Sequence, residues 1–285
     1  MTTTTTAPRV ALQNVLYERL GAVARIYHHR PNARNAENTA LLDELNEAFR
    51  TAGADPEVRV IILGGSGSHF SAGHDLKEAM TDRAHYTVEE RWDYEAERYF
   101  GYALNIWDCP KPTIAQVQGA CVAGAFMVAN MCDLIVASDD AFFADPVCQT
   151  LAAASCEVLI HPWVMGLRRA KELLFTGERM DAQEAYRIGM VNRIVPTPDL
   201  QEATLALAEK IAATPPFAMK LLKRSLNRTW DVQGLRSALS AHFETHQLTH
   251  VTDETKQIRL HGPGAAIGKG RSGPSRNPPH ANHEK

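Results

Sequence analysis

The chain has 285 residues, of which 45% are hydrophobic and 22% are charged, enough apolar material for one large folded domain with a helical appendage. Its formal net charge is −3, from 30 Lys and Arg against 33 Asp and Glu, so its composition excludes the strong charge bias of proteins that bind nucleic acid or anionic membranes. The sequence has no apolar run long enough to span a bilayer and no secretory leader pattern, and its five cysteines lack C-x-x-C spacing. We therefore expect a cytoplasmic protein with free thiols.

The ends of the chain differ in composition from the rest. Residues 1–9 are rich in threonine and residues 261–285 are rich in Gly, Pro, Ser and Asn, so we expect both segments to be disordered. Between them the hydrophobic pattern predicts two strands over 15–29 that meet at Leu20-Gly21, and then an amphipathic helix over 37–53. A buried strand follows over 58–67.

The alternation of strands and helices continues. The pattern predicts a strand over 112–119, a short helix over 123–131, one or two strands over 132–144 and a helix over 169–177 that ends at Gly177. Such alternation favours parallel strands joined by right-handed crossovers, here as a β/α core over residues 10–200. Amphipathic helices alone are predicted for residues 201–260.

Two predicted strands lead into a helix through a turn of small residues. The turns are Gly73-His74-Asp75 and Ala123-Gly124-Ala125. The first N–H groups of a helix have no partner within the helix, and small residues let a ligand approach the backbone. Two such N–H groups aimed at one point would form an oxyanion hole. Alternatively, the glycines are ordinary turn residues.

Four segments of the chain resemble the crotonase superfamily, also called the enoyl-CoA hydratase/isomerase superfamily. They are "HRPNARNA" (29–36), "FSAGHDLKE" (70–78), "KPTIAQVQGACVAGAFMVANMCDLIVAS" (111–138) and "ELLFTGERMDAQEAYRIGMVNRIV" (172–195), within a resemblance that covers about residues 10–230. The resemblance implies an α/β fold, a spiral of β-β-α repeats, with a C-terminal helical trimerisation region. The family assembles as trimers or hexamers.

The resemblance also implies a ligand and a site. The ligand would be an acyl-CoA thioester, with no separate cofactor, and its carbonyl oxygen would accept hydrogen bonds from the backbone N–H groups of His74 and Gly124. Asp75 would be a helix cap. The CoA moiety would lie near Ala72, Asp75 and the cations Arg30 and Lys77, although surface cations are usually only solvated.

The chain departs from the family at both catalytic glutamates. Met127 and Val147 stand at their positions, and neither side chain can carry a proton. If residues 142–147 are extended, Asp145 shares a face with Val147 and is the first replacement candidate, although an Asp-Pro pair often simply forms a turn. Glu157 is a weaker candidate, because residues 151–160 read as a helix that would more simply place it on a solvated face.

These departures leave three functions open: an enzyme that forms a thioester enolate, a non-catalytic fatty acyl-CoA binding protein, and a decarboxylase that uses His74. The sequence around His74 resembles that of the methylmalonyl-CoA decarboxylase branch, but the loop after Pro146 lacks that branch's tyrosine. Alternatively, only the backbone of His74 matters.

Three histidines recur at four-residue spacing near the C-terminus. His242, His246 and His250 would lie along one face of a helix, too far apart for all three to bind one ion. We therefore expect a solvent-facing or subunit-facing surface there and no metal site.

Overall fold

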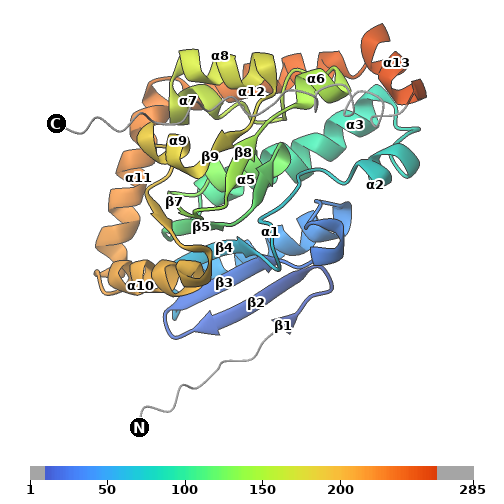
Figure 1. Ribbon diagram of the computed structural model, residues 1–285. Coiled ribbons are helices and arrows are strands. Elements are labelled where there is room, and N and C mark those ends of the chain that lie inside the picture. The colour runs from blue at the N-terminus through green and yellow to red at the C-terminus, as the bar shows by residue number, and fades with distance from the viewer. Residues whose placement is uncertain (1–9, 262–285) are drawn as a thin grey trace, which may run out of the picture.

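The computed structural model describes residues 10–261 and arranges them around one large and one small β-sheet (Figure 1). The large sheet has the strand order β1-β2-β3-β4-β5-β7-β10 and the small sheet the order β6-β8-β9. The strands are β1 (Val10–Ala11), β2 (Val15–Leu20), β3 (Val23–His28), β4 (Val60–Gly65), β5 (Thr113–Val117), β6 (Ala120–Val122), β7 (Leu134–Ser138), β8 (Phe142–Ala144), β9 (Met180–Asp181) and β10 (Arg193–Val195).

Helices occupy most of the remaining described chain. They are α1 (Thr39–Ala54), α2 (Leu76–Thr81), α3 (Val88–Glu95), α4 (Tyr102–Trp107), α5 (Gly124–Asn130), α6 (Val147–Leu151), α7 (His161–Met165), α8 (Leu167–Thr176), α9 (Ala182–Arg187), α10 (Leu200–Ala212), α11 (Pro216–Val232), α12 (Leu235–Thr249) and α13 (Asp253–His261). Short 3-10 turns cover Pro31–Ala33 and Thr197–Asp199, and a π-helical turn covers Ala96–Gly101. The expected disorder of residues 1–9 and 262–285 lies outside the described residues, while His261, expected to be disordered with them, is the last residue of α13.

The strand pairings confirm the predicted hairpin and the predicted parallel pairing of the later strands. β2 and β3 form an antiparallel hairpin at Gly21, while β3, β4, β5, β7 and β10 pair in parallel. All six residues of β4 are buried, as a central parallel strand requires. Gly177 ends α8 in a left-handed conformation (φ 66°), which glycine adopts without a steric cost.

Each turn of the spiral places a strand in the large sheet, a shorter extended segment in a second layer, and then a helix. β5-β6-α5 and β7-β8-α6 are complete repeats, with β6 parallel to β8. In the two earlier repeats the second layer shrinks to single parallel bridges, Ser71 with Cys121 and Glu37 with His74. The second layer therefore brings Glu37, His74 and the start of α5 to one place.

The large sheet packs helices on both faces. α10 covers one face with apolar side chains, and α1 packs against β2 and β3 as part of the main core. The C-terminal helices α11 to α13, orange to red in Figure 1, run up one side of the core and across its top. None of the helices of residues 10–261 is long and apolar enough to cross a membrane.

Two local expectations are wrong. Residues 145–147 are not extended, because the chain turns at Pro146 and α6 starts at Val147, so Asp145 and Val147 do not share a strand face. Residues 152–160 form an irregular loop rather than a helix, with Ala152 and Ser155 in left-handed conformations. The alanine-rich sequence of residues 151–160 has a high helix propensity, but contacts with the rest of the protein override it.

Candidate active site

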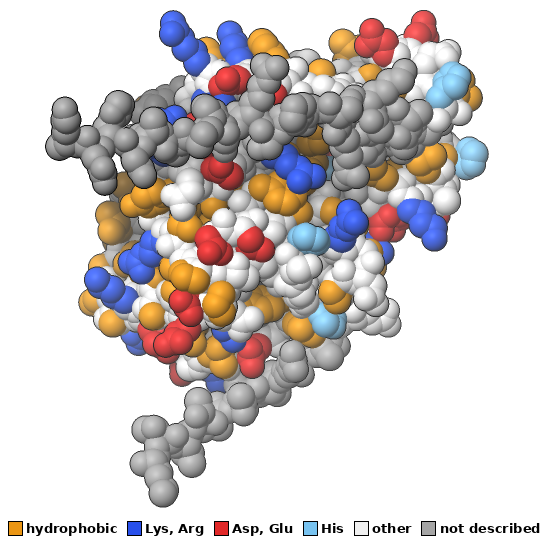
Figure 2. Space-filling model, viewed as in Figure 1, with side chains coloured by type: hydrophobic (Ala, Val, Ile, Leu, Met, Phe, Trp, Pro, Cys, Tyr) orange, Lys and Arg blue, Asp and Glu red, His pale blue; other side chains and the backbone are white. Residues whose placement is uncertain are grey.

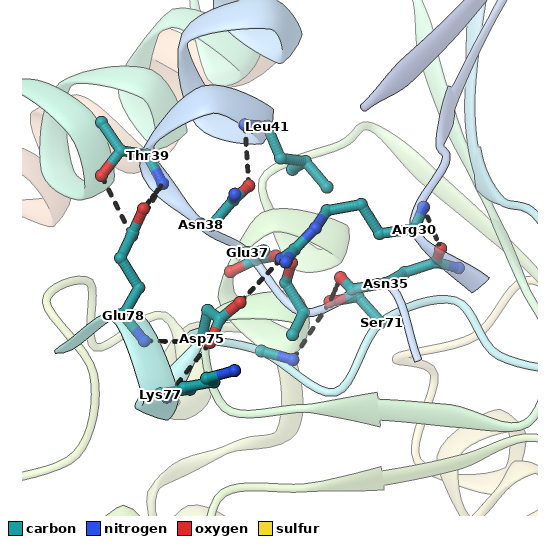
Figure 3. Close-up of polar contacts among 12 residues, drawn as sticks. Arg30, Asn35, Glu37, Asn38, Thr39, Leu41, Ser71, Asp75, Lys77 and Glu78 are labelled. Atoms are coloured by element: carbon teal, nitrogen blue, oxygen red, sulfur yellow. Dashed lines mark hydrogen bonds and ion pairs between the residues drawn. The ribbon is translucent and has the colours of Figure 1, made fainter. Parts of the chain in front are cut away.

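Asn35 clamps the loop after β3 onto the loop after β4. It is fully buried, and its side-chain amide donates to the carbonyl oxygens of Ser66, His69 and Phe70 at 2.8–3.1 Å. The Ser71 hydroxyl then donates to the Asn35 carbonyl at 2.7 Å and accepts from the Gly73 N–H at 3.0 Å (Figure 3). These bonds fix the backbone that leads into the first glycine turn.

Two polar contacts hold the start of α2 against the chain between the end of β3 and the start of α1. Arg30 forms an ion pair with Asp75 at 2.8 Å, and Glu78 accepts from the N–H and hydroxyl of Thr39 at 2.9 and 3.0 Å (Figure 3). Asp75 also caps α2, as predicted, by accepting from the backbone at Lys77 and Glu78. Burial raises the pKa of Asp75, but Arg30 and the capping bonds outweigh it and hold the pKa below its ordinary value. Asp75 is thus an ionised partner of Arg30.

The residues expected near CoA have different exposures. Lys77 is exposed, while Ala72 is half-buried and donates its N–H to the Arg34 carbonyl at 3.0 Å. Arg30 keeps one guanidinium nitrogen on Asp75 and on the Ala36 carbonyl. Of the two cations predicted to contact CoA, Lys77 is therefore the more accessible.

The two turns at Gly73-His74 and Ala123-Gly124 lie against each other. In each turn the first residue has a positive φ, 80° at Gly73 and 54° at Ala123. A Cβ atom placed on Gly73 would come within 3.1 Å of the Gly124 nitrogen and 2.4 Å of the Val122 carbonyl oxygen. Among the described residues, the N–H groups of His74 and Gly124 donate to no other group. Each of these two neighbouring turns therefore presents one backbone N–H group that a ligand could accept from.

The His74 imidazole is held on two sides. Its Nε2 lies 3.0 Å from Oε1 of Glu157, and its ring stacks on Tyr99 with centroids 4.0 Å apart. Burial lowers the pKa of His74, but the carboxylates of Glu157 and then Glu37 outweigh it and raise the pKa. Glu157 is 1% exposed, so the expectation of a solvated face is wrong. The irregular loop, rather than a helix, turns this carboxylate inward.

Glu37 is the residue that sequence reasoning missed. It is fully buried, and neither carboxylate oxygen has a hydrogen-bond partner among the described residues. Burial raises its pKa to about 7. A Cβ on Gly124 would lie 2.5 Å from Glu37 Oε2 and 2.7 Å from His74 Nδ1. The sequence carried one signal: Glu37 precedes the N-cap Asn38 as His74 precedes the N-cap Asp75.

The structure gives Asp145 other partners. Asp145 is fully buried, accepts from the Ser155 hydroxyl at 2.6 Å and from the Val147 N–H at 3.1 Å, and lies 3.3 Å from His161 Nε2. Burial raises its pKa, but His161 and these hydrogen bonds outweigh it and lower the pKa. Met127 in α5 and Val147 in α6 are both buried. Asp145 is thus held ionised in a network separate from His74.

His246 is buried and His242 and His250 are half-buried, so the expectation of a solvent-facing surface is wrong. His242 Nε2 contacts the Cys156 carbonyl at 2.8 Å, and His246 and His250 contact Glu95. Among the described residues, two groups of three side chains could each hold a metal ion, His74 with Cys156 and Glu157, and Glu95 with His246 and His250. Burial raises the pKa of Cys156 well above its usual range, which disfavours the thiolate that a metal requires.

On the face that Figure 2 draws, Lys and Arg side chains are interspersed with Asp, Glu and hydrophobic side chains. This mixture agrees with the nearly balanced formal charge of the chain, −3.

Known proteins share both sequence and fold with this chain. A family model described as enoyl-CoA hydratase/isomerase matches residues 18–265. The Mycobacterium tuberculosis (strain ATCC 25618 / H37Rv) protein EchA13, whose name places it with the enoyl-CoA hydratases, is 40% identical over 247 residues, 81% of this chain and 78% of its own. A carnitinyl-CoA dehydratase of Proteus mirabilis (strain HI4320) is 36% identical over 211 residues, 73% of this chain and 78% of its own.

A solved structure agrees with these relatives. The crystal structure of an enoyl-CoA hydratase/isomerase from Xanthobacter autotrophicus Py2 is 37% identical and superposes with a TM-score of 0.85, covering 92% of this chain and 98% of that one. Together with the spiral of repeats and the paired turns, these similarities show that the chain belongs to the enoyl-CoA hydratase/isomerase family, the crotonase superfamily.

Proposed function

We propose that the protein binds an acyl-CoA thioester and stabilises its enolate with the backbone N–H groups of His74 and Gly124. The observation that carries this proposal is the pairing of the two turns. Their two N–H groups have no acceptor among residues 10–261, and a Cβ atom on Gly73 would lie 3.1 Å from the Gly124 nitrogen. When a proton leaves the α-carbon of a thioester, negative charge gathers on the carbonyl oxygen. Two preorganised donors lower the energy of that state, by about 3 kcal/mol for each donor in comparable sites.

We further propose that Glu37 and His74 move the proton, in place of the glutamates absent at Met127 and Val147. Both side chains lie against Gly124, next to the proposed oxyanion position. A carboxylate whose pKa is about 7 is matched to proton transfer near neutral pH. Glu37 would accept the α-proton as the C–H electron pair moves into the enolate, and the His74 imidazolium would return a proton to carbon. Glu157 orients the imidazole through its 3.0 Å contact.

A non-catalytic acyl-CoA binding protein is the second candidate. It is favoured by one observation, that Met127 and Val147 are apolar and buried where hydratases of the family carry glutamates. In this case the paired turns would hold the thioester carbonyl without chemistry.

The test is incubation of the purified protein with enoyl-, acyl- and malonyl-type CoA thioesters in deuterated water, followed by mass spectrometry of the thioesters. We expect deuterium uptake at the α-carbon or addition of water. Loss of CO₂ from a malonyl-type thioester would instead assign a decarboxylase. Measurable thioester binding with no change in mass would assign the binding protein.

A further inference from the structure

A buried cluster at the C-terminal ends of α12 and α3, next to the His74 partner Glu157, brings three ligand atoms to one point. Glu95 Oε2 lies 3.4 Å from His246 Nε2 and 3.1 Å from His250 Nε2, and the two nitrogens are 3.1 Å apart. The side chains of Glu95 and His246 are 5% and 4% exposed, and that of His250 is 14% exposed. The three atoms thus form a nearly equilateral triangle in the protein interior.

This triangle has the size of one face of a metal coordination shell. With metal–ligand bonds of about 2.0–2.1 Å, neighbouring ligand atoms lie about 3.3 Å apart in a tetrahedral shell and about 2.9 Å apart in an octahedral one. The observed edges of 3.1–3.4 Å match these spacings to within about 0.2 Å. Two histidines four residues apart on a helix present both imidazoles to one side, and a carboxylate from another element is a common third ligand.

The surroundings orient the carboxylate as they do in known metal sites. Gln247 Nε2 donates to Glu95 Oε2 at 2.7 Å, and an Arg91 guanidinium nitrogen lies 3.5 Å from Oε1. Such outer contacts fix the rotamer of a ligating carboxylate. A second acid, Glu157 Oε1, lies 3.9 Å from His246 Nε2 and adds negative charge near the triangle. Glu95 also directly precedes the π-helical turn over Ala96–Gly101, a rare geometry that often marks functional positions.

We propose that Glu95, His246 and His250 bind a divalent first-row transition metal ion, such as Zn²⁺ or Fe²⁺, through one carboxylate oxygen and two imidazole nitrogens. The ion ties the C-terminal helix α12 to the end of α3. His246 Nδ1 is buried without a hydrogen-bond partner in the described part of the chain, and it must carry the proton when Nε2 binds the metal. This unpaired N–H weakens binding, so we expect affinity below that of a closed structural zinc site.

The test uses the full chain, stripped with a chelator and then dialysed against Zn²⁺, with the bound metal measured by mass spectrometry. We expect about one Zn²⁺ per chain, and a rise in Tm with Zn²⁺ concentration. Glu95→Gln and His250→Ala should each weaken Zn²⁺ binding by at least about tenfold. His85→Ala, which removes an exposed histidine, is the matched control and should bind Zn²⁺ as the parent protein does.

Two further readouts separate the site from nonspecific binding. Co²⁺ in the parent protein should give visible absorption bands typical of low coordination number, and these bands should be absent in Glu95→Gln, whose fold is checked by circular dichroism. The same titration with Fe²⁺ under nitrogen identifies the preferred ion. The proposal is overturned if the parent protein binds no more metal than Glu95→Gln, or if His85→Ala loses as much metal as His250→Ala. Deuterium uptake by the thioesters is measured separately, so a failure of metal binding and a failure of the enolate chemistry are distinguishable.

Discussion

Glu37 and His74 occupy equivalent positions in consecutive repeats, each just before the N-cap of a helix, and a parallel bridge joins them. The bridge places a carboxyl group and an imidazole beside Gly124 from neighbouring segments of the second layer. Each residue would be unremarkable in its own segment. At the scale of single residues, therefore, the site depends on one buried carboxyl group that has no hydrogen-bond partner in the described structure.

The buried Glu37 should make stability depend on pH. Its pKa rises from 4.5 to about 7 on folding, so the folded protein keeps a proton that the unfolded chain releases. This contribution is fully present below about pH 4.5 and is lost as the pH rises through about 7. We expect Glu37→Gln, which stays neutral, to gain stability relative to the parent by up to roughly 3 kcal/mol between pH 5 and pH 8.

Denaturant unfolding at both pH values measures this difference. Glu57→Gln, at an exposed carboxylate, is the control and should show no such trend. A constant difference between Glu37→Gln and the parent across this range would mean that Glu37 is ionised throughout.

At the scale of elements, Asn35 joins two repeats whose connecting loops would otherwise have unpaired carbonyls. We expect Asn35→Ala to lower the free energy of unfolding by about 3 kcal/mol, because three carbonyl oxygens, of which that of Phe70 is buried and the other two are partly buried, lose a donor. Asn105→Ala removes a single exposed amide contact, to Asn46, and should cost well under 1 kcal/mol. Chemical denaturation of both variants checks the contrast, and equal losses would contradict the clamp.

The sequence predicts elements with a regular hydrophobic period much better than it predicts the segments between them. The hairpin over 15–28, the strands β4, β5 and β7 and the helices α1, α5, α8, α10, α11 and α12 agree with the pattern. All of them except α11 bury one face or both against a neighbour, whereas α11 leaves Phe217, Leu222 and Leu226 exposed. Residues 88–107 form α3, a π-helical turn and α4, and their polar sequence shows no hydrophobic period from which these helices could be predicted.

The candidate site was only partly predictable for the same reason. The turns at His74 and Gly124 have a local signature, small residues between a strand and a helix. Glu157 and Glu37 reach His74 and Gly124 through an irregular loop and a single β-bridge, which depend on contacts distant in sequence. The expectation that Asp145 shares a strand face with Val147 is wrong because the chain turns at Pro146 and enters α6. The buried position of His246 could not be predicted, because four-residue spacing on a helix does not tell which face of the helix is buried.

At the scale of the whole molecule, a buried ion pair attaches the C-terminal helices to the core. Lys223 on α11 lies 2.8 Å from Asp133, before β7, and also donates to the Lys111 carbonyl at 3.0 Å. Its side chain is only 7% exposed. We expect Lys223→Ala to destabilise the protein by about 3–5 kcal/mol, because Asp133 is left without its counter-charge.

Arg236→Ala is the matched control for this prediction. Arg236 pairs with Asp108 at 2.5 Å, but both side chains are more than 40% exposed, so its loss should cost about 0–1 kcal/mol. Thermal unfolding of both variants gives the comparison. If Lys223→Ala and Arg236→Ala lower the stability by a similar small amount, α11 is held to the core mainly by its apolar contacts.

In the proposed complex, the N–H groups of His74 and Gly124 donate hydrogen bonds to the thioester oxygen. The most direct measurement is the infrared carbonyl stretch of an acyl-CoA carrying ¹³C at the thioester carbon, bound to the parent protein and to Gly124→Ala. The added Cβ would lie 2.5 Å from Glu37 Oε2 and 2.7 Å from His74 Nδ1, so either these side chains or the start of α5, which carries the Gly124 N–H, must shift. Gly53→Ala, where the nearest atom lies 3.8 Å away, is the control. We predict that the stretch moves to lower frequency in the parent protein and in Gly53→Ala, and returns toward its free value in Gly124→Ala. A bound thioester whose carbonyl stretch is unshifted in the parent protein would contradict the account.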